Sequence, residues 1–218
     1  MKIEKLQYIF DPLCGWCYAS SPALTYLAQT YPEVLELLPS GLFSGEGARP
    51  ISPQFASYAW TNDQRIASLT GQRFSEEYQK LLNSGGDFDS HALNCALTAC
   101  KIIAPDAEVG LLHELQTARY VRGLDTSRSD VVAEISNQYA ANKQLEIHFP
   151  TQSDPFAAGT ELSDITEQRT DSVKQLMRST GMSGVPLLLV TVAGKTSAIS
   201  GACLYGGSTA ISKALEKL

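Results

Sequence analysis

Two cysteines that stand three positions apart, Cys14 and Cys17, are the residues of this 218-residue chain that most directly suggest chemistry. They lie in the segment YIFDPLCGWCY (8–18). A Cys-X-X-Cys pair can be a reversible disulfide, half of a metal site, or two ordinary buried thiols. Which of the three applies depends on the elements that position the pair.

The first 43 residues predict a strand, a helix and a second strand. A proline, Pro12, ends the first strand because it cannot donate to a ladder, and we expect a helix over 14–31 that Pro22 kinks. The second strand is expected over 34–43. The first strand, over 2–10, is indicated by a run of β-forming residues: Ile3, Tyr8, Ile9 and Phe10.

A helix that starts at Cys14 would place its sulfur where unpaired backbone N–H groups and the positive end of the helix dipole converge. A thiolate is favoured in that position, since helix N-termini and Cys-X-X-Cys motifs lower a cysteine pKa from about 8.5 to between about 3.5 and 7.5. We therefore expect Cys14 to be the more exposed, attacking thiol. Cys17, one turn further on, would be the resolving thiol that releases a mixed disulfide.

The rest of the chain changes character twice. A Gly- and Pro-rich boundary, GEGARPISP (45–53), is followed by helical patterning, and a dense apolar run, PLLLVTV (186–192), then begins a strand, a turn, a strand and a helix. We predict an α/β fold in which residues 1–45 and 182–218 form one domain and residues 46–181 form an inserted helical domain. The elements expected beyond the boundary are helices over 58–82, 91–103, 111–120 and 131–141, a loop over 148–159, a helix that ends at Met177 with Gly181 as its cap, a Gly194-Lys195 turn, a strand over 196–200, and a last helix capped by Ser208.

Composition excludes several classes of function. The formal net charge is −6, which argues against a nucleic-acid surface. No segment approaches the roughly 18 apolar residues of a membrane span, and Glu4, Lys5 and Gln7 interrupt any secretory signal near the start. We expect a cytoplasmic protein, in which cysteines are more often catalytic, metal-binding or buried than cross-linked. No second Cys-X-X-Cys or His-X-X-X-His completes a tetrahedral metal site.

The order of elements and three segments carry a family resemblance. DPLCGWCY (11–18), ARYVRGLDTS (118–127) and SGVPLLLV (183–190) together resemble the DsbA-like family, a thioredoxin fold with a large helical insertion, and within it FrnE-like proteins and cytoplasmic protein-disulfide isomerases. The resemblance spans the full length. It implies a cis peptide bond between Val185 and Pro186 that faces the dithiol. Because Pro186 has no N–H, the Val185 backbone would be free to pair with an extended substrate.

Two departures from well-known members bear on the chemistry. The dipeptide between the cysteines is Gly15-Trp16 rather than Pro-His, so we expect a less extreme redox potential. The buried acid that many thioredoxin-fold enzymes carry six positions before the first cysteine is here Tyr8. Asp11 is the nearest acid, and it is either a proton relay or, the interpretation we favour, a turn residue before Pro12. Trp16 stands between two reactive thiols, which favours substrate contact over packing.

The remaining candidate residues fit ordinary structural roles better than catalytic ones. Cys95 and Cys100, five apart on a helix, are expected to be buried structural thiols, and a redox role for Cys203 is the less favoured interpretation. Tyr18 fits packing and substrate contact equally. No partner at ligand spacing is found for the three histidines, His91, His113 and His148. A cluster at the start of the helical region is expected in the helix core: Tyr58, Ala59 and Trp60.

The sequence therefore predicts a thiol–disulfide oxidoreductase or isomerase that acts on protein or small-molecule disulfides without a metal or organic cofactor. A small-thiol or thioredoxin-type system would recycle it, and glutathione fits as a co-substrate. One alternative is a glutathione-dependent transferase or isomerase of the kappa-class or hydroxychromene-carboxylate isomerase type, although those use a Ser-type site where this chain has Cys14. A zinc-binding thiol protein is a further alternative. The residues leave the direction of exchange open.

Overall fold

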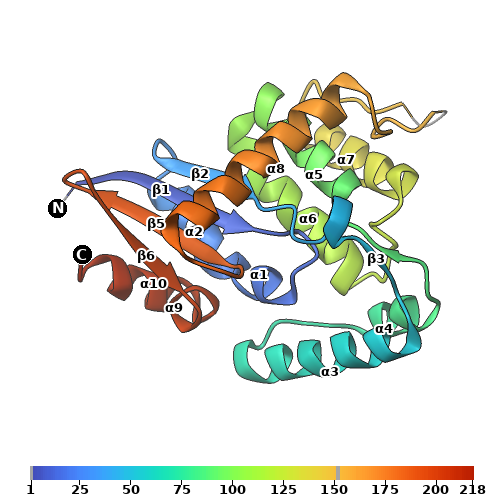
Figure 1. The fold of residues 1–218 in the computed structure, drawn as a ribbon, viewed down its shortest axis with the longest axis horizontal. Helices are drawn as coiled ribbons and strands as arrows, with labels where there is room; N and C mark the ends of the chain where they lie inside the picture. Colours follow the sequence, from blue (N-terminus) through green and yellow to red (C-terminus); the bar gives the residue numbers. More distant parts are fainter. Residues whose placement is uncertain (1, 151–152) are drawn as a thin grey trace.

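A four-stranded sheet with strand order β2-β1-β5-β6 forms the centre of the computed structural model, which describes residues 2–150 and 153–218 (Figure 1). Strand β1 runs parallel to β2 and antiparallel to β5, and β5 and β6 form an antiparallel hairpin. The bounds are β1 Ile3–Phe10, β2 Leu35–Pro39, β5 Leu187–Val192 and β6 Lys195–Ser200. Met1 and residues 151–152 of the expected 148–159 loop lie outside the described residues.

Side chains of the two central strands alternate between two apolar cores. On one face, residues of β1 and β5 pack with helices α2 (Ser21–Thr30) and α10 (Gly207–Leu215); on the other they pack with α8 (Glu161–Thr180). The first set is Leu6, Tyr8, Phe10, Leu188 and Val190; the second is Ile9, Leu187 and Leu189, with Val173 of α8. Because both faces are covered, β5 reads in the sequence as a nearly continuous apolar run.

The connection between β1 and β2 contains two helices where the sequence predicted one kinked helix. Helix α1 (Gly15–Ala19) ends at Ser20, and α2 begins directly after it. Pro22 lies in the first turn of α2, where its missing N–H removes no helix bond. The proline therefore begins a second helix instead of bending the first.

The C-terminal part contains a similar correction. The segment after β6 forms a short helix, α9 (Ala202–Tyr205), before α10. The break falls at Gly206 and Gly207, and Gly207 has a φ of +79°. Ser208 therefore lies inside α10 and does not cap it. The hairpin turn also falls one residue earlier than expected, at Ala193-Gly194, both with positive φ.

The helical region between the sheet's halves follows the sequence prediction with one addition. The amphipathic helical stretches expected over 58–82 are two helices separated at Gly71, whose φ is +74°. A two-residue strand pair, β3 with β4, was not predicted because it is too short to show a period. The bounds are η1 Gly45–Gly47, β3 Arg49–Pro50, α3 Pro53–Thr70, α4 Glu76–Asn83, β4 Asp87–Phe88, α5 His91–Ile103, η2 Pro105–Ala107, α6 Glu108–Tyr120 and α7 Ser129–Lys143.

Helix α8 joins the helical region to the sheet, so the domain division proposed from the sequence stays a prediction. Arg169 of α8 donates a hydrogen bond to the Leu37 carbonyl of β2 at 2.8 Å and another to the Glu108 carboxylate of α6. Both charged side chains are largely buried, and burial raises the pKa of Glu108 while the Arg169 charge partly lowers it. In the described part of the chain, no helix is long and apolar enough to span a membrane.

Replacing Arg169 by Met should lower the free energy of unfolding by about 3–5 kcal/mol, because it leaves the Glu108 charge buried without its partner. Urea denaturation at pH 7 measures this change. Arg128→Met is the matched control, since the Arg128–Asp130 pair has side chains 62% and 60% exposed and should contribute almost nothing. Equal effects of the two substitutions would show that the buried pair does not hold α8 in place.

Candidate active site

The two cysteines lie where β1 passes into α1. Cys14 is the N-cap residue of α1 in extended conformation, and its carbonyl accepts the first helical hydrogen bond from the Tyr18 N–H at 3.0 Å. The Asp11-Pro12-Leu13 turn before it is closed by a bond from the Cys14 N–H to the Asp11 carbonyl, at 3.1 Å. Cys14 therefore occupies the helix start that the sequence predicted, with the helix itself beginning one residue later.

The two thiols differ in their surroundings. Cys14 is 9% exposed and Cys17 is 2% exposed, so Cys14 is the more accessible of the two although both are largely covered. Burial raises the pKa of Cys17 well above the ordinary thiol value, and the neighbouring Cys14 raises it further. At neutral pH Cys17 is therefore protonated. The attacking role of Cys14 stays a prediction.

The segment before β5 lies against Cys14. The peptide bond between Val185 and Pro186 is cis, as the resemblance implied. The Cys14 Sγ lies 3.7 Å from the Val185 carbonyl oxygen, although 171 positions separate the two residues. Val185 is half-buried and Pro186 is buried. The structure thus places the dithiol and the Val-Pro segment in one site.

Two hollows adjoin this segment, and Val185 lines both of them. The smaller, about 270 Å³, is lined by Trp16, Val185, Pro186 and Tyr205 among others. The larger, about 710 Å³, runs from Val185 between α8 and the 40–47 loop. Trp16 itself is half-buried and packs on the Tyr205 ring at 4.6 Å between centroids, so substrate contact by Trp16 stays a prediction.

With this geometry in view, the molecule can be compared with known proteins. No protein-family model and no curated protein matches the chain. Among solved structures, the cytosolic disulfide reductase DsbM from Pseudomonas aeruginosa has a TM-score of 0.78 and 24% identity, covering 98% of this chain and 97% of that one. The same reductase with GSH has a TM-score of 0.75 and 23% identity, covering 98% and 100%.

The chain has the DsbA-like thioredoxin fold. A 2-hydroxychromene-2-carboxylate isomerase is also similar, with a TM-score of 0.54, 14% identity, and coverage of 97% of this chain and 94% of that one. At these identities the likeness establishes the fold. What the DsbA-like fold does in this chain has to be argued from its own residues.

Asp11 is fully buried and is held by three donors. Its carboxylate accepts hydrogen bonds from the Leu13 N–H at 2.9 Å, the Phe43 N–H at 3.1 Å and the Ser90 hydroxyl at 3.0 Å. Burial raises the pKa of Asp11 to about 6, against the opposing effect of these bonds. The contacts tie the loop before Cys14 to two distant segments, which supports the turn interpretation. A proton-relay role for Asp11 stays a prediction.

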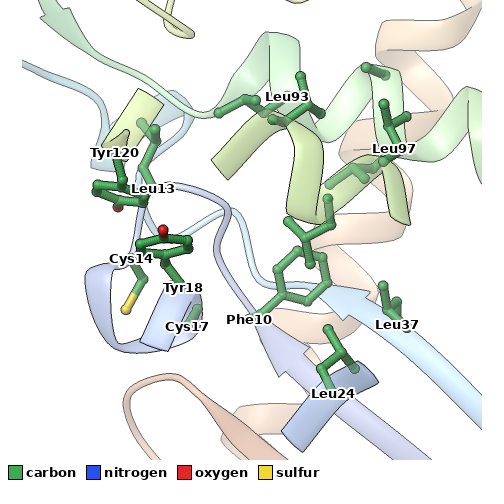
Figure 2. Close-up of a cluster of buried hydrophobic side chains, with 14 of the residues drawn as sticks. Phe10, Leu13, Cys14, Cys17, Tyr18, Leu24, Leu37, Leu93, Leu97 and Tyr120 are labelled. Carbon is green, nitrogen blue, oxygen red and sulfur yellow. The ribbon is translucent and has the colours of Figure 1, made fainter. Parts of the chain in front are cut away.

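Aromatic residues fill the space around the dithiol loop. Tyr8 is buried, and its hydroxyl lies 3.5 Å from the Cys17 carbonyl oxygen; burial raises its pKa, and the nearby Cys17 and Cys14 charges raise it further. Tyr18 stacks on Tyr120 at 4.8 Å, and Figure 2 shows the two rings facing each other beside Cys14. The Tyr18 side chain therefore packs between α1, to which it belongs, and Tyr120 of α6.

Cys95 and Cys100 are buried on α5, as predicted. Burial raises the pKa of Cys95 to about 11 and that of Cys100 to about 12, so both are unreactive thiols at neutral pH. The Cys95 Sγ also lies 3.6 Å from the Nε2 atom of His91. Cys203 is half-buried in α9. Its role remains a prediction.

Three further sequence-based expectations can be compared with the structure. Tyr58 was expected in the helix core but is 71% exposed, because α3 is covered on one face only; Ala59 is buried and Trp60 is half-buried. His113 and His148 are exposed. Within residues 2–150 and 153–218, no group of three or more His, Cys, Asp or Glu side chains is placed to hold a metal ion.

One contact at the dithiol was missed entirely. The carboxylate of Asp63, in the middle of α3, lies directly against Gly15: a Cβ atom built on Gly15 would be 2.3 Å from the Asp63 Oδ1 atom. No spacing or motif joins residues 15 and 63 in the sequence. Only the packing of α3 on α1 brings them together.

A brief pulse of iodoacetamide on the reduced protein at pH 7 should alkylate Cys14 before Cys17, Cys95 and Cys100. The reasons are its greater exposure and its position at the start of a helix, where a thiolate is favoured. Cys203, which is more exposed, measures how fast an ordinary accessible thiol reacts, and we expect it to be slower than Cys14. Peptide mass mapping gives the order, and earlier labelling of Cys95 or Cys100 would overturn the assignment.

Proposed function

We propose that this chain is a thiol–disulfide oxidoreductase or isomerase acting on protein or small-molecule disulfides through Cys14 and Cys17. The observation that carries the proposal is the position of the Cys14 sulfur, at the N-cap of α1 and 3.7 Å from the Val185 carbonyl. This arrangement puts a nucleophilic thiol beside a backbone segment that can hold an extended substrate. The similarity in fold to a cytosolic disulfide reductase agrees with it.

The reaction divides into two exchanges. The Cys14 thiolate attacks one sulfur of a substrate disulfide; the other substrate sulfur leaves as a thiolate, and a mixed disulfide forms. Cys17 then gives up its proton and attacks the Cys14 sulfur, which expels the second substrate thiolate. The substrate gains two electrons and two protons, and the protein is left with a Cys14–Cys17 disulfide. The reverse sequence oxidises a substrate dithiol.

The cis Val185-Pro186 segment supplies the docking surface. Pro186 has no N–H, and the Val185 carbonyl already faces the Cys14 sulfur, so an extended substrate can pair with this backbone. The 710 Å³ hollow beyond Val185 carries Lys174 and Arg178 among its lining residues. Glu46, Glu167 and Asp171 line the same hollow and Lys174 is paired with Asp171, so Arg178 is the lining cation that best suits a carboxylate of a peptide or of glutathione.

Returning the disulfide to the dithiol requires an external reductant, for which we propose glutathione or a thioredoxin-type dithiol. The related reductase with GSH supports a small thiol in this role. A cytoplasmic location, which keeps such thiols reduced, fits this direction of exchange. Protein thiols remain the principal substrates in this proposal, since two open hollows that share Val185 in their linings offer room for a polypeptide chain.

A glutathione-dependent transferase or isomerase is the second candidate. Its support is the likeness to the 2-hydroxychromene-2-carboxylate isomerase together with the large hollow that Val185 lines. A transferase needs one activated thiol group or hydroxyl, whereas this chain holds a second, protonated thiol one turn further along the same helix. That second thiol favours disulfide exchange.

Cys17→Ser should trap cellular proteins as mixed disulfides on Cys14, because the resolving thiol is gone. Non-reducing electrophoresis of the purified variant, followed by release with dithiothreitol, measures the trapped fraction. The matched control is Cys203→Ser, which keeps both site thiols and should trap as little as the unsubstituted protein. A Cys17→Ser protein that forms no adducts, while Cys14 is shown to be free and alkylated rapidly, would favour the transferase.

A further inference from the structure

Asp63 is a buried carboxylic acid of the helical insertion that contacts the dithiol loop. It is 4% exposed, and its Oδ2 atom accepts a hydrogen bond from the Tyr78 hydroxyl at 2.8 Å. Its Oδ1 atom occupies the space where a side chain on residue 15 would begin, since a Cβ there would lie 2.3 Å from Oδ1 and 3.1 Å from the Ile66 Cδ1 atom. A side chain between Cys14 and Trp16 would therefore displace the Asp63 carboxyl group.

The charged and titratable groups around Asp63 come from α4 and α6. Tyr78 is the hydrogen-bond donor, and the buried Tyr120 lies close enough for its pKa to be raised by both Asp63 and Cys14. The fully buried Arg119 guanidinium lies 5.9 Å from the centre of the Tyr78 ring and 3.7 Å from Asp125, and its nitrogens have no hydrogen-bond partner among the described residues. Among the described residues, Arg119 is thus the cation whose charge attracts that of Asp63.

Asp63 changes its charge in the physiological range. Burial raises the pKa of Asp63 to about 7, while the Tyr78 bond and the Arg119 charge act in the opposite direction. The carboxyl group is consequently neutral in mildly acidic solution and anionic in mildly alkaline solution. A group with this property next to a redox pair can make the pair respond to pH.

We propose that Asp63 is a positioning residue of the dithiol, which fixes glycine at position 15 and shifts the Cys14–Cys17 pair toward the disulfide when it is ionised. The proposal rests on the proposed redox function. Gly15 directly follows Cys14, so covalent geometry limits the distance between the Asp63 carboxylate and the Cys14 sulfur to about 10 Å. Through a buried medium a negative charge at this distance disfavours the Cys14 thiolate.

The sign follows from the charges of the two redox forms. When Cys14 is ionised, the reduced pair carries a negative charge that the disulfide lacks. Ionised Asp63 then raises the free energy of the reduced form only, so it makes the protein a stronger reductant. Protonated Asp63, or asparagine at this position, removes that effect and makes the protein a weaker reductant.

Asp63→Asn should therefore lower the equilibrium constant for oxidation of the pair by glutathione disulfide at pH 8, by about three- to tenfold when Cys14 is ionised in the reduced form. It should also raise the rate of Cys14 alkylation at a pH where Cys14 is only partly ionised, because the thiolate fraction increases. At pH 5.5, where Asp63 is already protonated, both differences should largely disappear. Glutathione redox buffers with quantification of the two forms give the first value, and timed iodoacetamide labelling gives the second. Asp63→Glu should keep the pH dependence, and Asp130→Asn, on the surface of α7, should change neither value.

The two proposals fail differently. If the unsubstituted pair does not exchange with glutathione, the redox function fails, and the alkylation rates still decide whether the Asp63 charge acts on Cys14. If the pair exchanges and Asp63→Asn leaves both values unchanged, or changes them equally at pH 5.5 and pH 8, the electrostatic role of Asp63 is wrong.

A stability cycle tests the steric part without any redox measurement. Gly15→Ala should lower the urea midpoint in the unsubstituted protein, because the new methyl group meets the Asp63 carboxylate. In an Asp63→Ala background, the same substitution should have a clearly smaller effect. Equal effects in the two backgrounds would show that Asp63 does not restrict residue 15.

Discussion

The antiparallel register between β1 and β5 is the constraint on which the site depends. It sets Ile9 opposite Leu187, so the last residues of β1 and the first residues of β5 lie at the same end of the sheet. Cys14 and Val185 lie just beyond these two points, which is why residues so distant in sequence approach within 3.7 Å. A slip of one residue would exchange the side chains of β5 between the two cores. The apolar pattern that fixes the core therefore also fixes the distance between the thiol and the backbone that faces it.

The helical insertion holds the dithiol loop from the side opposite the sheet. Asp11 binds Ser90 at the start of α5, Tyr18 stacks on Tyr120 of α6, and Gly15 meets Asp63 of α3. Each contact is buried, so the loop is enclosed in a medium of low polarity in which charges act over longer distances than in water. The insertion thereby determines the electrostatic surroundings of the thiols, in addition to forming one wall of the large hollow.

How far the sequence predicted this arrangement depends on the kind of signal. Strand β5 and helix α5 were predicted almost to the residue because each has a long, regular apolar pattern. The Cys14–Val185 approach was predicted from the family resemblance, since no local pattern joins two such distant segments. The break at Ser20 and the strand pair β3–β4 were missed because one turn or two residues show no period. The Asp63–Gly15 contact was missed because it arises only when two helices pack together.

In the proposed exchange, the unequal burial of the two thiols also orders the steps. Burial raises the pKa of Cys17, and a charge on Cys14 raises it further, so Cys17 keeps its proton whenever Cys14 is ionised. Once Cys14 is bound in a mixed disulfide, its charge is gone and that second contribution disappears. Loss of the Cys17 proton then becomes easier at the stage when resolution requires it. The proximity of the two sulfurs, which brings the second thiol within reach of the first, therefore also prevents it from reacting early.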